Sequence, residues 1–177
     1  MTADPHSAVA EAFRFAAGSV ERIRAARGPR LSLVFVSTTA CAGRSAVVAN
    51  VALALAESGT SVLAVDADGA DGDLTALLLP DSPTADGFEQ VLAGQRAAAD
   101  CIQTSPLHEG VAIIGSGQTT PGRATGAAYS KAVERMLADA NARFDVVLIN
   151  SPEPPGHTPQ GRLRLADPRQ RGATQPR

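Results

Sequence analysis

Short apolar runs that alternate with helix-like segments constrain this 177-residue chain more than any other feature. Four runs read LSLVFVS (31–37), SVLAVDAD (61–68), GVAIIGSG (110–117) and DVVLIN (145–150). Nearly continuous apolar runs of this length are typical of buried parallel strands, and helices between parallel strands form crossovers that cover the sheet. The sequence therefore predicts an α/β fold, with a doubly wound, mostly parallel sheet and helices on both faces.

Helical periodicity fills the segments around and between these runs. The helices that we expect lie at 8–26, 43–59, 73–79, 87–94 and 125–144. Gly59 stands where the C-cap glycine of a helix belongs. We expect three parts: an N-terminal helix and linker (1–30), the domain that carries the sheet (31–155), and a disordered tail rich in proline and arginine (156–177).

Composition excludes several classes of protein. The net charge of −2 argues against a general nucleic-acid-binding surface, so no nucleic-acid partner is expected. Two cysteines, Cys41 and Cys101, form neither a disulfide framework nor a metal-binding spacing, which fits a reducing compartment. No apolar run reaches the roughly 20 residues of a membrane span, and the N-terminus lacks the pattern of a signal peptide. We therefore expect a cytoplasmic protein.

The stretch STTACAGRSAVV (37–48) follows the first expected strand and opens the next helix. A phosphate-binding loop needs converging backbone N–H groups, a helix N-terminus, and a cation and a hydroxyl for the terminal phosphates and Mg²⁺. Against the pattern G-x-x-x-x-G-K-[ST], Gly43 and Ser45 match, while Thr38 replaces the first glycine and Arg44 replaces the lysine. Arg44 keeps the positive charge on a larger, planar group. Ser45 is either a Mg²⁺ ligand or an ordinary hydroxyl at a helix start.

Polar residues also end the second and fourth apolar runs. Asp66 and Asp68 alternate at a strand end, so both side chains are expected to point to one side. Beside a phosphate-binding loop they would hold Mg²⁺ through water or take a proton; without one they are an ordinary polar cap on a strand. Asn150 ends the fourth run. Because ligands of such folds bind beyond the carboxyl ends of the strands, we expect these residues and the loop to form one site.

Taken in order, these motifs resemble the deviant-Walker P-loop ATPases, the ParA and MinD type. The segment LSLVFVSTTACAGRSAVVANVALALAESGTSVLAVDAD resembles their loop and second aspartate-bearing motif, and FDVVLINSPEPPG resembles their Walker B strand. Within that superfamily the chain is most similar to the bacterial tyrosine kinases of capsule and exopolysaccharide synthesis. The resemblance implies a P-loop NTPase-like fold that is incomplete at its C-terminal side. Because relatives continue with strands that flank the first strand, it also implies an open edge along residues 31–37.

The resemblance further implies ATP or ADP with Mg²⁺ as the ligands of the site. It implies catalytic roles for Arg44, Asp66 and Asp68. The implied Mg²⁺ ligands are Ser45, Asp66 and Asn150. The implied nucleotide-binding residues are Thr39, Ala40, Cys41, Ala42, Gly43, Arg44, Ser45 and Ala46.

Partners are implied by the resemblance as well. Glu11 and Arg14 fall on the start of a Glu-x-x-Arg-x-x-Arg oligomerisation motif, whose last arginine is Ala17 here. This implies a homo-oligomer formed through Glu11 and Arg14. The family also implies a membrane chain-length regulator or adaptor, or an intact kinase subunit, as a partner that would hold the chain at the inner face of the membrane.

Departures from the family pattern bear on activity. Arg44 replaces the lysine, the uncharged Asn150 replaces the Walker B aspartate, and Tyr129 is the single tyrosine where relatives carry a tyrosine-rich tail. We therefore predict a nucleotide-binding domain with weakened or lost catalysis and a regulatory role in exopolysaccharide or capsule export. The alternatives are an active tyrosine autokinase or ATPase, an interaction subunit that binds no nucleotide, and a fragment.

Overall fold

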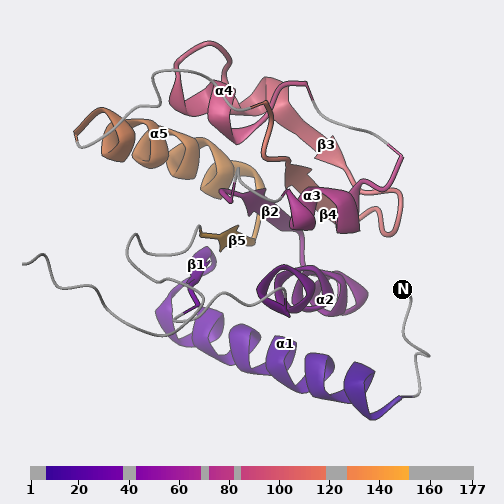
Figure 1. Ribbon diagram of the computed structural model, residues 1–177. Helices are drawn as coiled ribbons and strands as arrows, with labels where there is room; N and C mark the ends of the chain where they lie inside the picture. Colours follow the sequence, from indigo (N-terminus) through magenta and orange to yellow (C-terminus); the bar gives the residue numbers. More distant parts are fainter. Residues whose placement is uncertain (1–6, 38–42, 69–71, 82–84, 119–126, 152–177) are drawn as a thin grey trace, which may run out of the picture.

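The computed structural model describes residues 7–37, 43–68, 72–81, 85–118 and 127–151 (Figure 1). In chain order the elements are α1 (Ala8–Arg27), β1 (Leu31–Phe35), α2 (Gly43–Glu57), β2 (Val62–Asp66), α3 (Asp73–Leu78), α4 (Phe88–Leu92), the 3₁₀ turn η1 (Ala98–Cys101), β3 (Ile102–Thr104), β4 (Val111–Ile114), α5 (Ala127–Arg143) and β5 (Val146–Asn150). The predicted helices and strands are all present among them. None of the described helices combines the length and apolar character that a bilayer crossing requires.

The strands form one five-stranded sheet in the order β1-β5-β2-β4-β3. β1, β5, β2 and β4 run parallel to one another, and β3 pairs antiparallel with β4. The predicted α/β class with a mostly parallel sheet is therefore confirmed. The short strand β3 was not predicted, because three residues show no useful periodicity.

Alternate residues of the central strands enter two separate apolar layers. On β5, Val146 and Leu148 pack into the layer that α1, α2 and α3 complete. Val147 and Ile149 point the other way, into the layer completed by α4 and α5. Figure 1 shows α1 and α2 on one side of the sheet and α4 and α5 on the other. Every residue of β2 and β5 is buried, which explains why both strands read as continuous apolar runs rather than alternating ones.

α2 ends as its sequence predicts. Gly59 has a φ of +86°, a conformation that favours glycine. Its N–H donates to the Ala56 carbonyl at 2.9 Å, and the Thr60 N–H donates to the Leu55 carbonyl at 3.2 Å. This is the paired bonding of a Schellman motif, which satisfies two carbonyls that a helix end otherwise leaves open and turns the chain toward β2.

β1 forms one border of the sheet. Among the described strands it has β5 on one side and none on the other. Val34 on β1 is 57% exposed, and Val36, just beyond its end, is 66% exposed. The open edge that we expected for this strand is present within the described ranges, and it displays apolar side chains.

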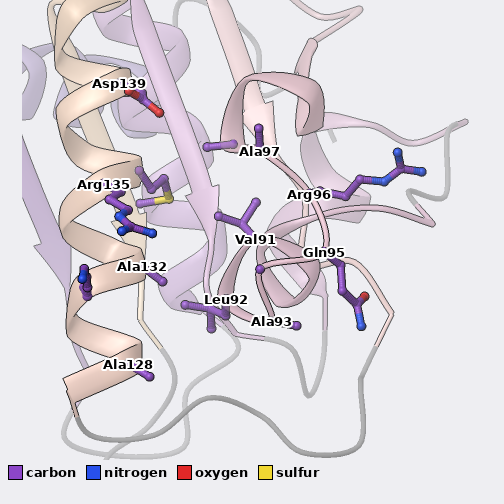
Figure 2. Close-up of a pocket in the computed structure, with 14 residues that line it drawn as sticks. Val91, Leu92, Ala93, Gln95, Arg96, Ala97, Ala128, Ala132, Arg135 and Asp139 are labelled. Atoms are coloured by element: carbon purple, nitrogen blue, oxygen red, sulfur yellow. The ribbon is translucent and has the colours of Figure 1, made fainter.

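A groove of about 620 Å³ runs between α5 and the chain from α4 to η1 (Figure 2). Its apolar lining includes Val91 and Met136, and α5 adds the charged side chains Lys131, Arg135 and Asp139. The groove shares no residue with the nucleotide site predicted from the sequence.

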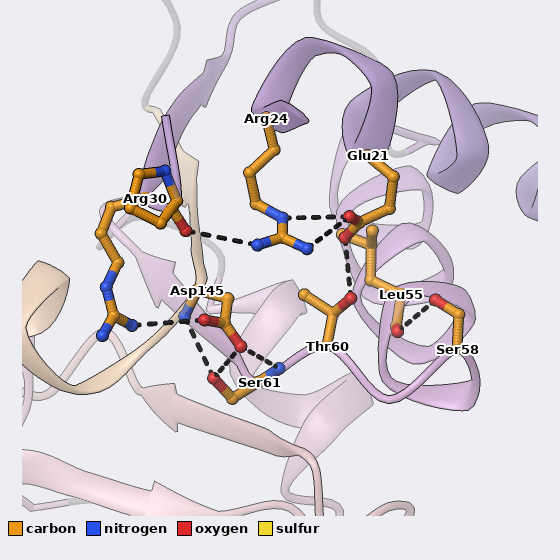
Figure 3. A network of polar contacts seen from close by, with 9 residues as sticks. Glu21, Arg24, Arg30, Leu55, Ser58, Thr60, Ser61 and Asp145 are labelled. Atoms are coloured by element: carbon orange, nitrogen blue, oxygen red, sulfur yellow. Dashed lines mark hydrogen bonds and ion pairs between the residues drawn. The ribbon is translucent and has the colours of Figure 1, made fainter. Parts of the chain in front are cut away.

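A polar network holds the opposite end of the sheet, where the central strands begin (Figure 3). Asp145 accepts hydrogen bonds from the Ser61 hydroxyl at 2.7 Å and the Ser61 N–H at 3.1 Å, and it contacts Arg30 at 3.3 Å. Beside it, Glu21 of α1 accepts from Arg24 at 2.7 Å and from the Thr60 hydroxyl at 2.7 Å. The network ties α1 to the loop that leads into β2.

Acid should weaken this network through Asp145. The Ser61 hydroxyl and N–H, with help from nearby arginine charge, lower the pKa of Asp145 below its ordinary 3.8. A lowered native pKa adds stability above the unfolded value, and that stability is lost as the pH falls through the native value. We expect Asp145→Asn to be less stable near neutral pH, and to lose less of its remaining stability than the parent as the pH falls below 3.8.

Urea unfolding at a series of pH values would measure this difference. Asp100→Asn, at an exposed position outside the network, is the control and should follow the parent at every pH. An Asp145→Asn profile that runs parallel to the parent profile in acid would contradict the role given to Asp145. Asp66, whose pKa is shifted in the opposite direction, is present in all three proteins and cancels from the comparison.

Gly87, at the start of α4, lies against the backbone that follows β4. A Cβ at this position would lie 2.3 Å from the Gly115 carbonyl oxygen and 2.4 Å from the Gly117 nitrogen. Since backbone atoms cannot rotate away as a side chain can, Gly87→Ala should lower the free energy of unfolding by about 1–3 kcal/mol.

Denaturant unfolding would measure that loss, with Gly18→Ala in α1 as a matched control. There the nearest atom to a new Cβ is the end of Arg22 at 3.8 Å, an ordinary contact. Because glycine is unfavourable inside a helix, this control should gain about 0.5–1 kcal/mol. Equal effects at the two positions would show that the close approach at Gly87 does not matter.

Candidate functional site

Polar side chains from α2, β2 and β5 meet at the carboxyl end of the sheet, as the sequence predicted. Arg44 stands at the first turn of α2, and its side chain is 8% exposed. Its Nε donates to Asn150 Oδ1 at 2.8 Å, and its Nη2 donates to Asp68 Oδ2. The guanidinium is therefore directed across the strand ends and held by two separate acceptors.

Asn150 lies at the centre of this cluster. Its Nδ2 donates to Ser45 Oγ at 3.2 Å and to Asp66 Oδ1 at 3.2 Å, and its Oδ1 accepts from Arg44. Since Arg44 Nε can only donate, Asn150 must turn its oxygen toward Arg44, and this fixes which end of the amide carries the N–H groups. Asn150 and Asp66 are fully buried, and Ser45 is 6% exposed.

Asp66 is surrounded by hydrogen-bond donors. Its Oδ2 accepts from the Thr75 N–H at 2.9 Å and from the Thr75 hydroxyl at 2.6 Å, while its Oδ1 accepts from Asn150. Burial raises the pKa of Asp66, and the bonds from Thr75 and Asn150 partly oppose that shift. The carboxyl group is thus part of the packed interior between β2 and α3.

Two residues of the cluster were not predicted. The Thr75 hydroxyl donates to Asp66 and accepts from the Ser116 N–H at 2.9 Å, so it links α3 to the segment after β4. The sequence held one signal for Thr75: it is a polar residue in the apolar helix DLTALL that closely follows an acidic strand end. Ser116 contributes through its backbone, which its residue type could not reveal.

The other predicted residues fall into two groups. Gly43 begins α2, and Ala46 lies in its first turn, where the Ala46 carbonyl accepts from Asn50 at 2.7 Å. Thr39, Ala40, Cys41 and Ala42 lie outside the described residues. The structure thus brings Arg44, Ser45, Asp66, Asp68 and Asn150 together.

One buried polar atom of the cluster lacks a hydrogen-bond partner among the described residues. Arg44 Nη1 is buried, and within the described part of the chain no hydrogen-bond acceptor is assigned to it. A buried N–H group without an acceptor costs free energy, more so when it carries charge. It lies at the N-terminal end of a 15-residue helix whose first turn contains no acidic residue. Both features favour an anion at this place.

The predicted Mg²⁺ ligands do not fit a divalent cation as the structure arranges them. Mg²⁺ needs oxygen ligands with free lone pairs. Asn150 directs its amide nitrogen at Ser45 Oγ and Asp66 Oδ1, and the other Asp66 oxygen already accepts two hydrogen bonds from Thr75. The Ser45 and Asp66 oxygens converge on Asn150, but Asn150 presents N–H groups there and no oxygen.

The predicted oligomerisation residues also have partners within the chain. Arg14 Nη1 contacts Glu11 Oε1 at 2.8 Å on the same helix, and Arg14 Nε contacts Glu57 Oε2 of α2 at 3.4 Å. Both are exposed ion pairs, which contribute little to stability. An oligomer formed through Glu11 and Arg14 stays a prediction.

Comparisons with known proteins agree with the fold and the motif order. No protein-family model matches the sequence. The tyrosine-protein kinase Wzc of Salmonella typhi is 28% identical over 120 residues, which are 68% of this chain and 16% of that protein. The solved kinase domain of the Escherichia coli tyrosine kinase Etk matches with a TM-score of 0.70 and 24% identity, over 85% of this chain and 57% of the Etk chain.

A second solved structure represents the MinD-type ATPases, which the sequence also resembles. The septum site-determining protein MinD of Pyrococcus horikoshii, complexed with Mg-ADP, matches with a TM-score of 0.54 and 26% identity, over 71% of this chain and 49% of that one. The chain resembles bacterial tyrosine kinase domains and MinD-type P-loop ATPases, so the resemblance predicted from its motifs is confirmed. It spans 16% of its curated relative and 57% of the Etk kinase domain.

Proposed function

We propose that this chain binds the phosphates of ATP or ADP at the N-terminal end of α2, and that it transfers phosphoryl groups weakly or not at all. The observation that carries the proposal is the buried guanidinium of Arg44, whose Nη1 amino group has no acceptor in the described residues. A charged N–H at a helix N-terminus is a strong donor to a phosphate oxygen. The similarity to MinD, solved with Mg-ADP, supports a nucleotide as the source of that phosphate.

Weakened catalysis is supported by the way in which the charged groups are paired. Phosphoryl transfer depends on cations and carboxylates that are free to act on the transferred group and the nucleophile. Here Arg44 is held by Asp68 and Asn150, and Asp66 is engaged by Thr75 and Asn150. Asp66, Asp68 and two of the three nitrogens of the Arg44 guanidinium therefore already have partners, which favours binding over turnover.

Isothermal calorimetry with ATP and with ADP tests the binding. We expect one nucleotide per chain. The absence of heat at millimolar nucleotide would contradict the proposal. Release of radiolabelled phosphate from ATP tests the second part: we expect turnover far below that of an active kinase domain, and efficient turnover or autophosphorylation of Tyr129 would favour the active-kinase alternative.

The setting that we propose is the regulation of exopolysaccharide or capsule export from the cytoplasmic face of the membrane. Its support is the similarity to the tyrosine-protein kinase Wzc and to the Etk kinase domain. In this role the nucleotide-bound chain would associate with an intact kinase subunit or a membrane chain-length regulator. Deletion of the gene should then change the amount or the length distribution of surface polysaccharide, and an unchanged polysaccharide would contradict this role.

The border strand β1 favours partner binding as a second function. Among the described strands its outer edge is unpaired, so it offers backbone N–H and C=O groups to a strand of another protein, and Val34 adds an exposed apolar contact. We expect Val34→Lys to reduce capture of an intact kinase subunit in a pull-down. Val47→Lys, at a 39% exposed position on α2, is the matched control and should capture as the parent does. Equal capture by both variants would rule out the β1 edge.

A further inference from the structure

We propose that the site binds phosphate without a divalent cation, and that Arg44 supplies the positive charge which a metal ion would otherwise bring. The ligand class is metal-free nucleotide, with its phosphate oxygen on Arg44 Nη1. The inference rests on the proposed nucleotide binding and adds that the nucleotide binds without a divalent cation. It starts from the disagreement between the predicted Mg²⁺ ligands and their arrangement in the cluster.

The first step concerns the ligands. Asn150 cannot offer its amide nitrogen to a metal, because that nitrogen carries only N–H groups. Its oxygen is the acceptor for Arg44 Nε at 2.8 Å, so turning the amide over would place N–H against N–H. With Asn150 fixed in this way, its Nδ2 stays directed at Ser45 Oγ and Asp66 Oδ1. The side of the expected metal site that Asn150 forms therefore presents N–H groups and no metal-binding atom.

The second step concerns charge. Mg²⁺ in nucleotide sites is bound through one or two carboxylates together with the phosphates, and the carboxylates of this cluster are Asp66 and Asp68. The carboxylate nearest to the strand ends besides Asp66 is Asp68, and it already pairs with Arg44. A Mg²⁺ ion here would lie beside a buried guanidinium and compete with it for the same carboxylate. Like charges in a poorly solvated place repel strongly.

The third step concerns the guanidinium itself. Nε is held by Asn150 and Nη2 by Asp68, so the plane of the group is fixed before any ligand arrives. Nη1 is buried and has no acceptor among the described residues, so a phosphate oxygen that reaches it would not have to displace either contact. A donor held in place in advance loses little conformational entropy on binding. A phosphate with Mg²⁺ already bound carries less negative charge, so the metal should compete with Arg44 and not assist it.

The test compares ADP binding by calorimetry in excess EDTA and in excess MgCl₂, at matched ionic strength. We expect the Kd in EDTA to lie within about threefold of the Kd in Mg²⁺, or below it. A loss of more than about tenfold in EDTA would overturn the inference and leave nucleotide binding standing. No binding under either condition would overturn the proposed function, and with it this inference.

A double variant makes the comparison sharper. Arg44→Lys with Asn150→Asp restores the lysine and the carboxylate of the family pattern, and we expect its ADP binding to become at least about tenfold stronger with Mg²⁺ than in EDTA. Arg30→Lys, in an exposed ion pair at the other end of the sheet, is the control and should stay insensitive to EDTA. A double variant that folds and remains insensitive would overturn the role given to Arg44 and Asn150.

Binding of Mn²⁺ alone, followed by electron paramagnetic resonance, gives a readout that does not depend on nucleotide. The parent protein should leave the signal of free Mn²⁺ unchanged, and the double variant should reduce it. Tight Mn²⁺ binding by the parent that Asn150→Ala abolishes would overturn the inference. If the double variant fails to fold, the EDTA and Mn²⁺ measurements on the parent still decide the question.

Discussion

Arg44→Met is expected to weaken ATP and ADP binding by about tenfold to a hundredfold, because a hydrogen bond to a charged group contributes about 1.5–3 kcal/mol. Methionine keeps an unbranched side chain, but it lacks the Nη1 group that we propose to bind the phosphate. It also leaves Asp68 without its cation, and this carboxylate would then repel a phosphate. Calorimetry with each nucleotide measures the change.

Controls separate this effect from a loss of structure. Arg30→Met removes another ion-paired arginine and should bind nucleotide as the parent does. Arg44→Lys keeps the charge but loses the planar group that Asn150 and Asp68 hold, so its loss of affinity should be smaller than that of Arg44→Met. Circular dichroism must show that each variant is folded. Unchanged nucleotide affinity in a folded Arg44→Met protein would remove Arg44 from the site.

Leu148→Ala is expected to lower the free energy of unfolding by about 2–5 kcal/mol. Leu148 is fully buried at the middle of β5, and its side chain packs in the apolar layer between the sheet and the helices α1, α2 and α3. Removing its side chain loses apolar burial and leaves a cavity, because strands on both sides hold β5 in place and limit collapse. Urea unfolding measures the change, which approaches the whole stability of many domains of this size.

Leu107→Ala provides the matched control. Leu107 is 44% exposed and lies in the turn before β4, so the same chemical change there should cost well under 1 kcal/mol. Equal losses at Leu107 and Leu148 would contradict the account of the core. A Leu148→Ala protein that loses little stability would show that the interior layer repacks around the missing side chain.

Most of the architecture could be predicted from the sequence because the strands β2, β4 and β5 are buried on both faces. The runs that became β1, β2, β4 and β5 are nearly continuous in apolar residues, with Ser32, Asp66 and Asn150 as the polar exceptions within the strands. This pattern is typical of buried parallel strands when helices separate them. The helix expected at 8–26 is present as Ala8–Arg27. β3 could not be predicted, since Ile102–Thr104 forms a strand only because β4 offers an antiparallel edge after the turn at η1.

The site was predictable in position but not in detail. Asp66 and Asn150 could be placed together because parallel strands end at the same side of a sheet. The direction of Arg44 could not, because it depends on which acceptors lie within reach of a long, flexible side chain. Asp68 and Asn150 provide them. The role of Thr75 could not be predicted either, because it depends on how α3 packs against β2.

The two apolar layers have a consequence for the alignment of the central strands. A shift of β2 against β5 by one residue would exchange the side chains that face the two layers, yet both layers are apolar, so hydrophobicity opposes it only weakly. The polar contacts at the two ends would break: Ser61 with Asp145 at one, Asp66 with Asn150 at the other. Asn150 therefore helps to set the alignment of β2 and β5 as well as the orientation of Arg44, and a substitution of Asn150 should also weaken the pairing of these two strands.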